Sequence, residues 1–170
     1  MKFWVYLGLC FLLVPLQTTI LGRANMMLVE PDVVLVAVCL IGLLTDELEG
    51  AWMGILLGFI QDLFSAGVAF PNLVTKGVLG ILAGLIGRQI VQVSSLVVSM
   101  TVILLSSLSG LAFLYLARGH ALWDAVLAVP TLLLPQALLD AILAIGVFWG
   151  VRQVAARYYT FQPSVLREDR

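Results

Sequence analysis

The chain has 170 residues, of which 62% are apolar and only 11% are charged, whereas soluble domains are about 45–50% apolar and about 25% charged. A water-soluble globule of this size would lack the polar side chains needed to cover its surface, and a net charge of -1 without a Lys/Arg cluster argues against a nucleic-acid-binding surface. The composition therefore predicts an all-α membrane protein with one multi-pass transmembrane domain at 1–156 and a short polar cytoplasmic tail at 157–170.

The first predicted span covers 3–22, a stretch that carries no charge and follows Lys2. A helix needs about 20 apolar residues to cross the hydrocarbon. The alternative is a secretory signal peptide, but the apolar stretch is long for one and no clean small-x-small cleavage site follows. We therefore favour a membrane span that remains in the protein.

The second predicted helix, at 33–45, opens after Pro31 and Asp32. Proline is tolerated in a first helical turn, and an acidic residue suits the positive end of the helix dipole. After an acidic turn at 46–49, four further helices are predicted at 50–64, 73–91, 94–117 and 131–155. An interfacial turn at 124–130 precedes the last of these helices. Six spans are favoured, with five as the main alternative, because the second and third helices are short.

Orientation follows from the Lys/Arg bias of short loops. With six spans and a cytoplasmic N-terminus, the cytoplasmic segments carry six Lys/Arg residues and the other face carries three, counting Lys76. Both termini are therefore predicted in the cytoplasm. The acidic turn at 46–49 would also be cytoplasmic, which is no contradiction because acidic residues contribute little to this bias.

Two helices carry stripes of glycine, which let another backbone approach closely in lipid. The third helix repeats glycine every four residues and the next helix repeats it every three or four. Intramolecular packing is the simpler interpretation, and a groove that admits a partner helix is the sharper one. The residues of this packing or partner face are Gly50, Gly54, Gly58, Gly77, Gly80 and Gly84.

Three ionisable residues, Asp62, Lys76 and Asp140, lie inside apolar segments. Each costs about 2.5–3.5 kcal/mol at a helix centre, so these side chains should face protein or water. Asp62 ends the third helix and Lys76 begins the fourth, so we expect these two to pair. Asp140 and Gln17 are placed to join them in one polar cluster. A structural ion pair is favoured, and a proton or substrate path is the alternative.

Motifs for chemistry are not visible in the sequence. There is one histidine, His120, and the two cysteines, Cys10 and Cys39, lie in apolar runs, where a thiol behaves as a small hydrophobic group. Neither a nucleotide-binding loop nor a nucleophile motif is present. We therefore expect a protein that is not an enzyme and uses no cofactor or metal, and the third alternative, an intramembrane enzyme, is disfavoured.

The segment 31–90 resembles a known family when taken as a whole. It runs from Pro31-Asp32 through an apolar helix and a polar turn to the glycine stripe that Asp62 closes, and then to Gly67 and a glycine-rich helix. This pattern is similar to that of the bacterial rod shape-determining protein MreD family. The acidic turn at 46–49 departs from the pattern, because a neutral or basic connection is expected there.

The resemblance implies a non-enzymatic scaffold of the cell-elongation complex in the bacterial inner membrane, which maintains cell shape. Its partners would be MreC, RodA with its transpeptidase partner, the cytoskeletal MreB indirectly, and membrane lipid, without nucleic acid. The family also resembles the substrate-binding S components of energy-coupling-factor vitamin transporters, so an S-component-like bundle is expected. A vitamin-binding S component, with its ligand near Gln17, Asp62, Lys76 and Asp140, is the alternative function.

Overall fold

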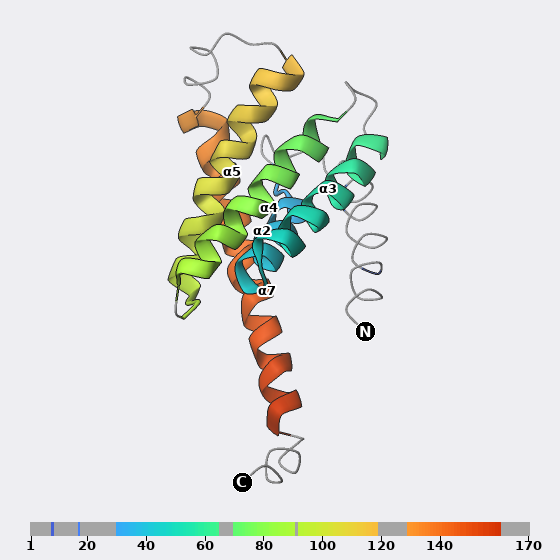
Figure 1. Cartoon of the computed structure of the whole chain (residues 1–170). Coiled ribbons are helices and arrows are strands. Elements are labelled where there is room, and N and C mark those ends of the chain that lie inside the picture. The colour runs from blue at the N-terminus through green and yellow to red at the C-terminus, as the bar shows by residue number, and fades with distance from the viewer. Residues whose placement is uncertain are drawn as a thin grey trace.

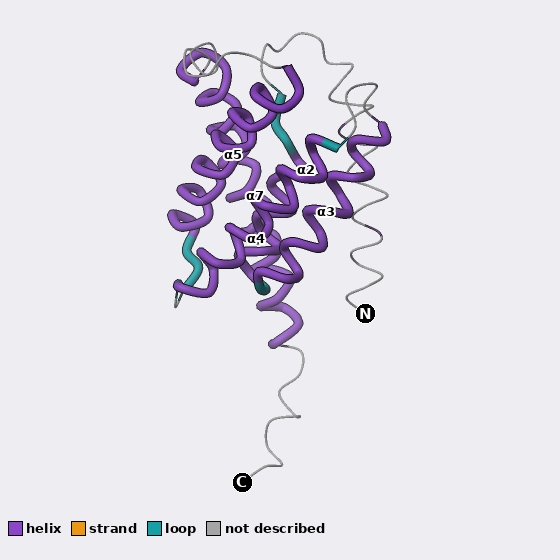
Figure 2. The backbone as a smooth tube through the Cα atoms, turned by 45° about the horizontal axis from the view of Figure 1, so that its top comes forward, coloured by secondary structure: helices purple, strands orange, loops and turns teal. Residues whose placement is uncertain are grey.

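The computed structural model describes residues 8, 17, 30–64, 70–90, 92–118 and 129–160, and within those ranges the chain is helical (Figures 1 and 2). This agrees with the predicted all-α class. Most of the first predicted span, the turn at 124–128, His120, Gly67 and the tail beyond residue 160 lie outside the described residues. The elements are α2 (Val33–Leu44), α3 (Glu47–Phe64), α4 (Pro71–Gln89), α5 (Ser95–Arg118), the π-helical turn η2 (Val129–Leu133) and α7 (Leu134–Thr160).

Helix caps move several boundaries away from the predicted ones. The acidic stretch predicted as a turn is mostly helix, because Asp46 accepts a hydrogen bond from the backbone N–H of Glu49 at 2.7 Å and starts α3 there. The fourth helix starts earlier than predicted, with Pro71 in its first turn, where the missing N–H costs nothing. The last helix continues to Thr160, into the segment predicted as tail.

The helices form two layers. α4 lies between α3 and α5 in the front layer, and α2 and α7 lie behind it (Figure 1). α2 contacts the four other described α-helices, α3, α4, α5 and α7. Its apolar residues are buried on nearly every side, as expected for a helix without a polar face. Neighbours in sequence run antiparallel, as short loops require. This arrangement places the start of α2 among residues from every other helix.

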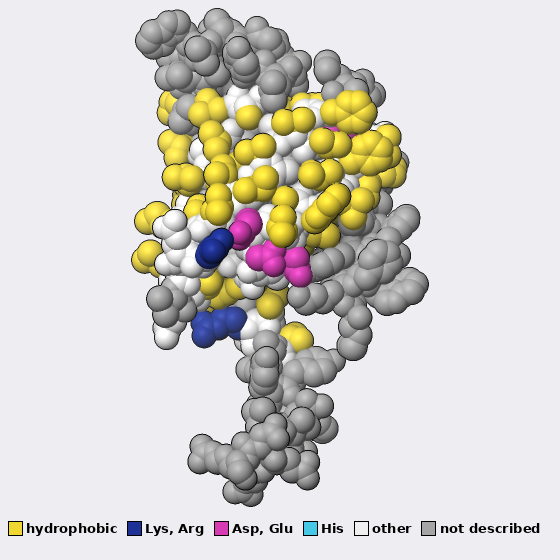
Figure 3. Space-filling view, in the orientation of Figure 1, with side chains coloured by type: hydrophobic (Ala, Val, Ile, Leu, Met, Phe, Trp, Pro, Cys, Tyr) yellow, Lys and Arg dark blue, Asp and Glu magenta, His cyan; other side chains and the backbone are white. Residues whose placement is uncertain are grey.

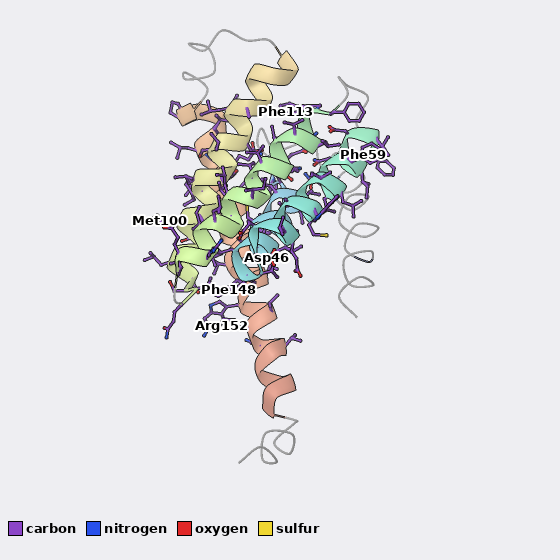
Figure 4. The ribbon with its side chains drawn as sticks, in the orientation of Figure 1. Asp46, Phe59, Met100, Phe113, Phe148 and Arg152 are labelled. Carbon is purple, nitrogen blue, oxygen red and sulfur yellow. The ribbon has the colours of Figure 1, made fainter. Side chains whose placement is uncertain are left out.

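The outer surface is apolar over most of its area. Two stretches, Ser95–Phe113 of α5 and Leu134–Val154 of α7, are long and apolar enough to cross a membrane, whereas α2 is apolar but short. Large apolar side chains are exposed along the outer sides, such as Met100 at 62% and Ile142 at 68%. Figure 3 shows hydrophobic side chains spread over the face in view, and Figure 4 shows Met100 on the outer side of α5.

A group of exposed charged side chains lies at one end of the described bundle. In Figure 3 Lys/Arg and Asp/Glu side chains lie close together in the lower part of the face in view, and Figure 4 places Asp46 and Arg152 there. Arg88 at the end of α4 lies 3.1 Å from Glu47 at the start of α3, and the Arg152 guanidinium lies 5.6 Å from the Phe148 ring centroid. This end carries the polarity expected where helices leave an apolar medium.

Candidate functional site

The start of α2 is the centre of a buried polar cluster. The Lys76 ammonium on α4 lies 2.9 and 3.1 Å from the two carboxylate oxygens of Asp32 and also contacts the Gln61 carbonyl oxygen on α3. Lys76 is fully buried, and the Asp32 side chain is 15% exposed. A charge in such a place is stable only with a partner and further hydrogen bonds, and Lys76 has both.

The side chain of Asp32 also caps α2, and Gln17 assists it. Asp32 Oδ1 accepts hydrogen bonds from the backbone N–H of Leu35 at 3.0 Å and from Gln17 Nε2 at 3.2 Å. Gln17 Oε1 in turn accepts from the backbone N–H of Val34 at 3.1 Å. The unpaired N–H groups of a helix start are thereby satisfied by side chains. The interpretation of Asp32 as a residue suited to the first turn of this helix is confirmed.

Asp140 joins α7 to the same point. Its Oδ1 accepts the backbone N–H of Asp32 at 2.7 Å, and its Oδ2 lies 2.5 Å from the Ser106 hydroxyl on α5. Asp140 is fully buried. Of the four residues expected in one polar cluster, Gln17, Lys76 and Asp140 lie in it and Asp62 does not. We call the six residues of this cluster the polar core: Gln17, Asp32, Gln61, Lys76, Ser106 and Asp140.

Asp62 lies outside the polar core, and its predicted pairing with Lys76 is wrong. The Asp62 carboxylate instead accepts the backbone N–H groups of Asn72 and Leu73, at 3.2 and 2.9 Å, and the Asn72 side-chain amide at 2.8 Å. The backbone N–H groups of Asn72 and Leu73 belong to the first turn of α4 and therefore have no hydrogen-bond acceptor within the helix. Asp62 therefore acts as a cap from the end of one helix to the start of the next.

The glycine stripes of α3 and α4 pack against each other. A Cβ added at Gly58 would lie 2.5 Å from the Asn72 carbonyl oxygen, and one added at Gly80 would collide with the backbone of Gly50. Gly54 faces the backbone of Lys76 in the same way. Glycine is thus required where two backbones touch, and the same close approach holds at Gly50 and Gly84, whereas Gly77 faces the Ile55 side chain.

Because these glycines are used within the chain, they form no open groove, and the idea that they admit a partner helix needs correction. The physical reason is that α3 and α4 are neighbours in sequence, joined by a short connection, so each is the first available partner for the other. The glycines without a neighbour within 4 Å are Gly146 and Gly150 on α7 and Gly8 among the described residues.

The buried polar side-chain atoms of the polar core are all hydrogen-bonded, as far as the structure describes the chain. No buried side-chain nitrogen or oxygen there lacks a hydrogen-bond partner, and the same residues contain no group of three His, Cys, Asp or Glu side chains that could hold a metal ion. The arrangement therefore links α2, α3, α4, α5 and α7 through hydrogen bonds and one ion pair.

Three members of the polar core, Asp32, Gln61 and Ser106, are not among the residues expected in the cluster. Asp32 is predicted from the sequence only as a residue at a helix start. Gln61 and Ser106 are uncharged residues of apolar helices. A signal existed for both, since each is a polar side chain within a largely apolar segment, but many serines in such helices bond only to their own backbone, as Ser107 does to the Ile103 carbonyl at 2.8 Å.

Comparison of the chain with family models, with curated proteins and with solved structures finds no match. The functional argument therefore depends on the residues and their geometry.

Proposed function

We propose that the chain is a non-enzymatic scaffold of the bacterial inner membrane, of the rod shape-determining MreD type, which binds MreC and links it to RodA-dependent wall synthesis. In this proposal the bundle has six spans with both termini in the cytoplasm. The charged end formed by the 46–49 stretch, Arg88 and Arg152 then faces the cytoplasm.

One observation carries the proposal: the residues that support the resemblance are those that hold the described bundle together. Asp32 caps α2 and pairs with Lys76, Asp62 caps α4, and the intervening glycines join α3 to α4. A pattern that fixes helix packing rather than a reactive centre suits a protein whose task is to hold other membrane helices.

The partner helix has to use the outer surface, because the glycine faces and the polar core are occupied within the chain. The exposed apolar side chains of α3 provide one continuous face for such contact, since they recur every three or four residues. Those in this repeat are Leu48, Trp52, Ile55, Leu56, Phe59 and Leu63, and Phe64 at the end of α3 is exposed as well. Figure 4 shows Phe59 on the outer edge of α3.

Cross-linking in native membranes tests the proposal. A photo-reactive amino acid is placed in turn at Trp52 on α3, Met100 on α5 and Ile142 on α7, and at the fully buried Leu57 as the matched control. We expect cross-links to MreC from one outer face and none from Leu57. The proposal would be contradicted if MreC were absent both from the cross-linked products and from a pull-down with the folded, tagged chain.

The same preparation addresses the transporter alternative. An S component of a vitamin transporter should show a thermal shift with one vitamin at micromolar concentration and should co-purify with a transporter ATPase. We expect neither, because the side chains assigned to a ligand in that alternative bind one another or cap a helix. Neighbouring genes give a further test, since shape-determining genes favour the scaffold and transporter ATPase genes favour the alternative.

A further inference from the structure

The polar core contains two carboxylates and one cation. Lys76 forms its ion pair with Asp32, and none of the residues that the structure describes forms an ion pair with Asp140. Asp140 is nevertheless fully buried, whereas the Asp32 side chain is 15% exposed. An ionised carboxylate without a cation in a low-dielectric interior is unfavourable by several kcal/mol, so such groups are paired or neutral.

The surroundings of Asp140 can be followed helix by helix. α2 presents the Asp32 carboxylate at its start and the Cys39 thiol about two turns further on. α4 presents Lys76, and α5 presents the uncharged Ser106. The positive end of α2, worth about half a charge, is already capped by the Asp32 carboxylate. The one cation among these neighbours of Asp140 is Lys76, and its ammonium already pairs with the Asp32 carboxylate at 2.9 Å.

We propose that Asp140 holds a proton and joins α7, α5 and the start of α2 as a neutral carboxylic acid. Its two oxygens then have distinct roles. Oδ1 accepts the Asp32 N–H at 2.7 Å, and the O–H at Oδ2 donates to the Ser106 hydroxyl oxygen across the 2.5 Å separation. O–H···O bonds span about 2.5–3.0 Å, and those to an ionised oxygen span about 2.5–2.7 Å, so the 2.5 Å separation permits either oxygen to be the donor. The charge balance, with one ammonium for two carboxylates, favours Asp140 as the donor.

A neutral acid at this point has a consequence for the bundle. The main apolar core takes residues from α2, α4, α5 and α7 together, and Asp140 on α7 adds hydrogen bonds to α5 and to the start of α2. Loss of its proton would set two carboxylates, Asp32 and Asp140, against a single ammonium. The two carboxylates would then repel each other, so the arrangement around Asp140 depends on its proton.

Infrared spectroscopy of the full chain in lipid tests the protonation state directly. The C=O stretch of a protonated carboxyl group has a higher frequency than the amide band of the backbone, and it is well separated from the carboxylate bands. We expect this acid band at neutral pH in the wild type and its loss in Asp140→Asn. The Asn side chain keeps an oxygen for the Asp32 N–H and an N–H for Ser106, so the variant should keep its thermal stability within about 2 °C, whereas Asp140→Ala should lose several degrees.

Ser106→Ala is the second variant, and it keeps the test decisive if Asp140→Asn does not fold. Removal of the Ser106 acceptor should shift the acid band to higher frequency without abolishing it. Absence of an acid band in the wild type, or a band unchanged in both Asp140→Asn and Ser106→Ala, overturns the proposal. This outcome is separate from the scaffold function, which is tested by partner capture.

Discussion

The pairing of Lys76 with Asp32 leads to a quantitative prediction. Lys76→Met removes the ammonium but keeps the length of an unbranched side chain, and it leaves Asp32 with its hydrogen bonds from Leu35 and Gln17. Removal of one partner of a buried pair costs about 3–5 kcal/mol. Because Asp32 keeps these two bonds and is partly exposed, we expect a cost near the lower end, about 3 kcal/mol.

Asp32→Asn should cost more, about 4 kcal/mol, because it leaves a fully buried ammonium with Gln61 as its remaining described partner. The double variant removes both charges together. We therefore expect it to be more stable than the sum of the two single losses predicts, with a coupling free energy of about 2 kcal/mol or more. Both single variants should lower the melting temperature by roughly 6–16 °C, at about 2–4 °C per kcal/mol for a chain of this size.

The assay is thermal or SDS-induced unfolding of the purified chain in one detergent, followed by circular dichroism across the mutant cycle. The matched control is the cycle of Asp62→Asn with Lys76→Met, since Asp62 caps α4 and does not bond Lys76. Its two losses should add within about 0.5 kcal/mol. A coupling larger in the Asp62 cycle than in the Asp32 cycle would refute the reasoning.

Three further predictions concern other contacts. Gly80→Ala should lose about 1–3 kcal/mol, because its Cβ meets the backbone of α3, whereas the control Gly146→Ala on the open face of α7 should unfold like the wild type or at a higher temperature. Asp62→Ala should lose about 0.5–2 kcal/mol as a lost cap and accelerate amide hydrogen exchange at the start of α4; unchanged exchange there would contradict this role. Arg88→Ala should change the unfolding free energy by less than about 1 kcal/mol, since the Arg88 side chain is 73% exposed beside Glu47; a larger loss would show an unrecognised contact.

The features that sequence reasoning predicted correctly are local ones. Glycine at spacings of three and four on consecutive helices indicates close packing, and in the structure the two stripes meet. Asp32 before an apolar run indicates a helix start, and Asp32 caps α2. Both inferences need only the helical repeat and the chemistry of free N–H groups.

The ion pair could not be predicted by the same reasoning. Proximity along the chain suggested Asp62 for Lys76, but the N–H groups at the start of α4 compete for Asp62 and lie closer to it. Asp32 is 44 residues away from Lys76, so the pairing depends on how α2 packs against α4, which local periodicity does not determine. Lys76 is fully buried, so its ammonium needs a carboxylate partner, and Asp32 is the carboxylate that it contacts.

The distribution of glycine and charge also limits where function can reside. α3 and α4 use their small residues on each other, and each buried polar side-chain atom in the described part of the chain has a hydrogen-bond partner. In lipid, helix association depends on packing and on a few polar contacts, because the hydrocarbon itself provides no hydrophobic driving force. The described bundle meets these needs through its internal contacts and exposes many large apolar side chains. Its selectivity for a membrane partner would then come from the shape of outer faces such as the exposed stripe of α3, rather than from buried charges.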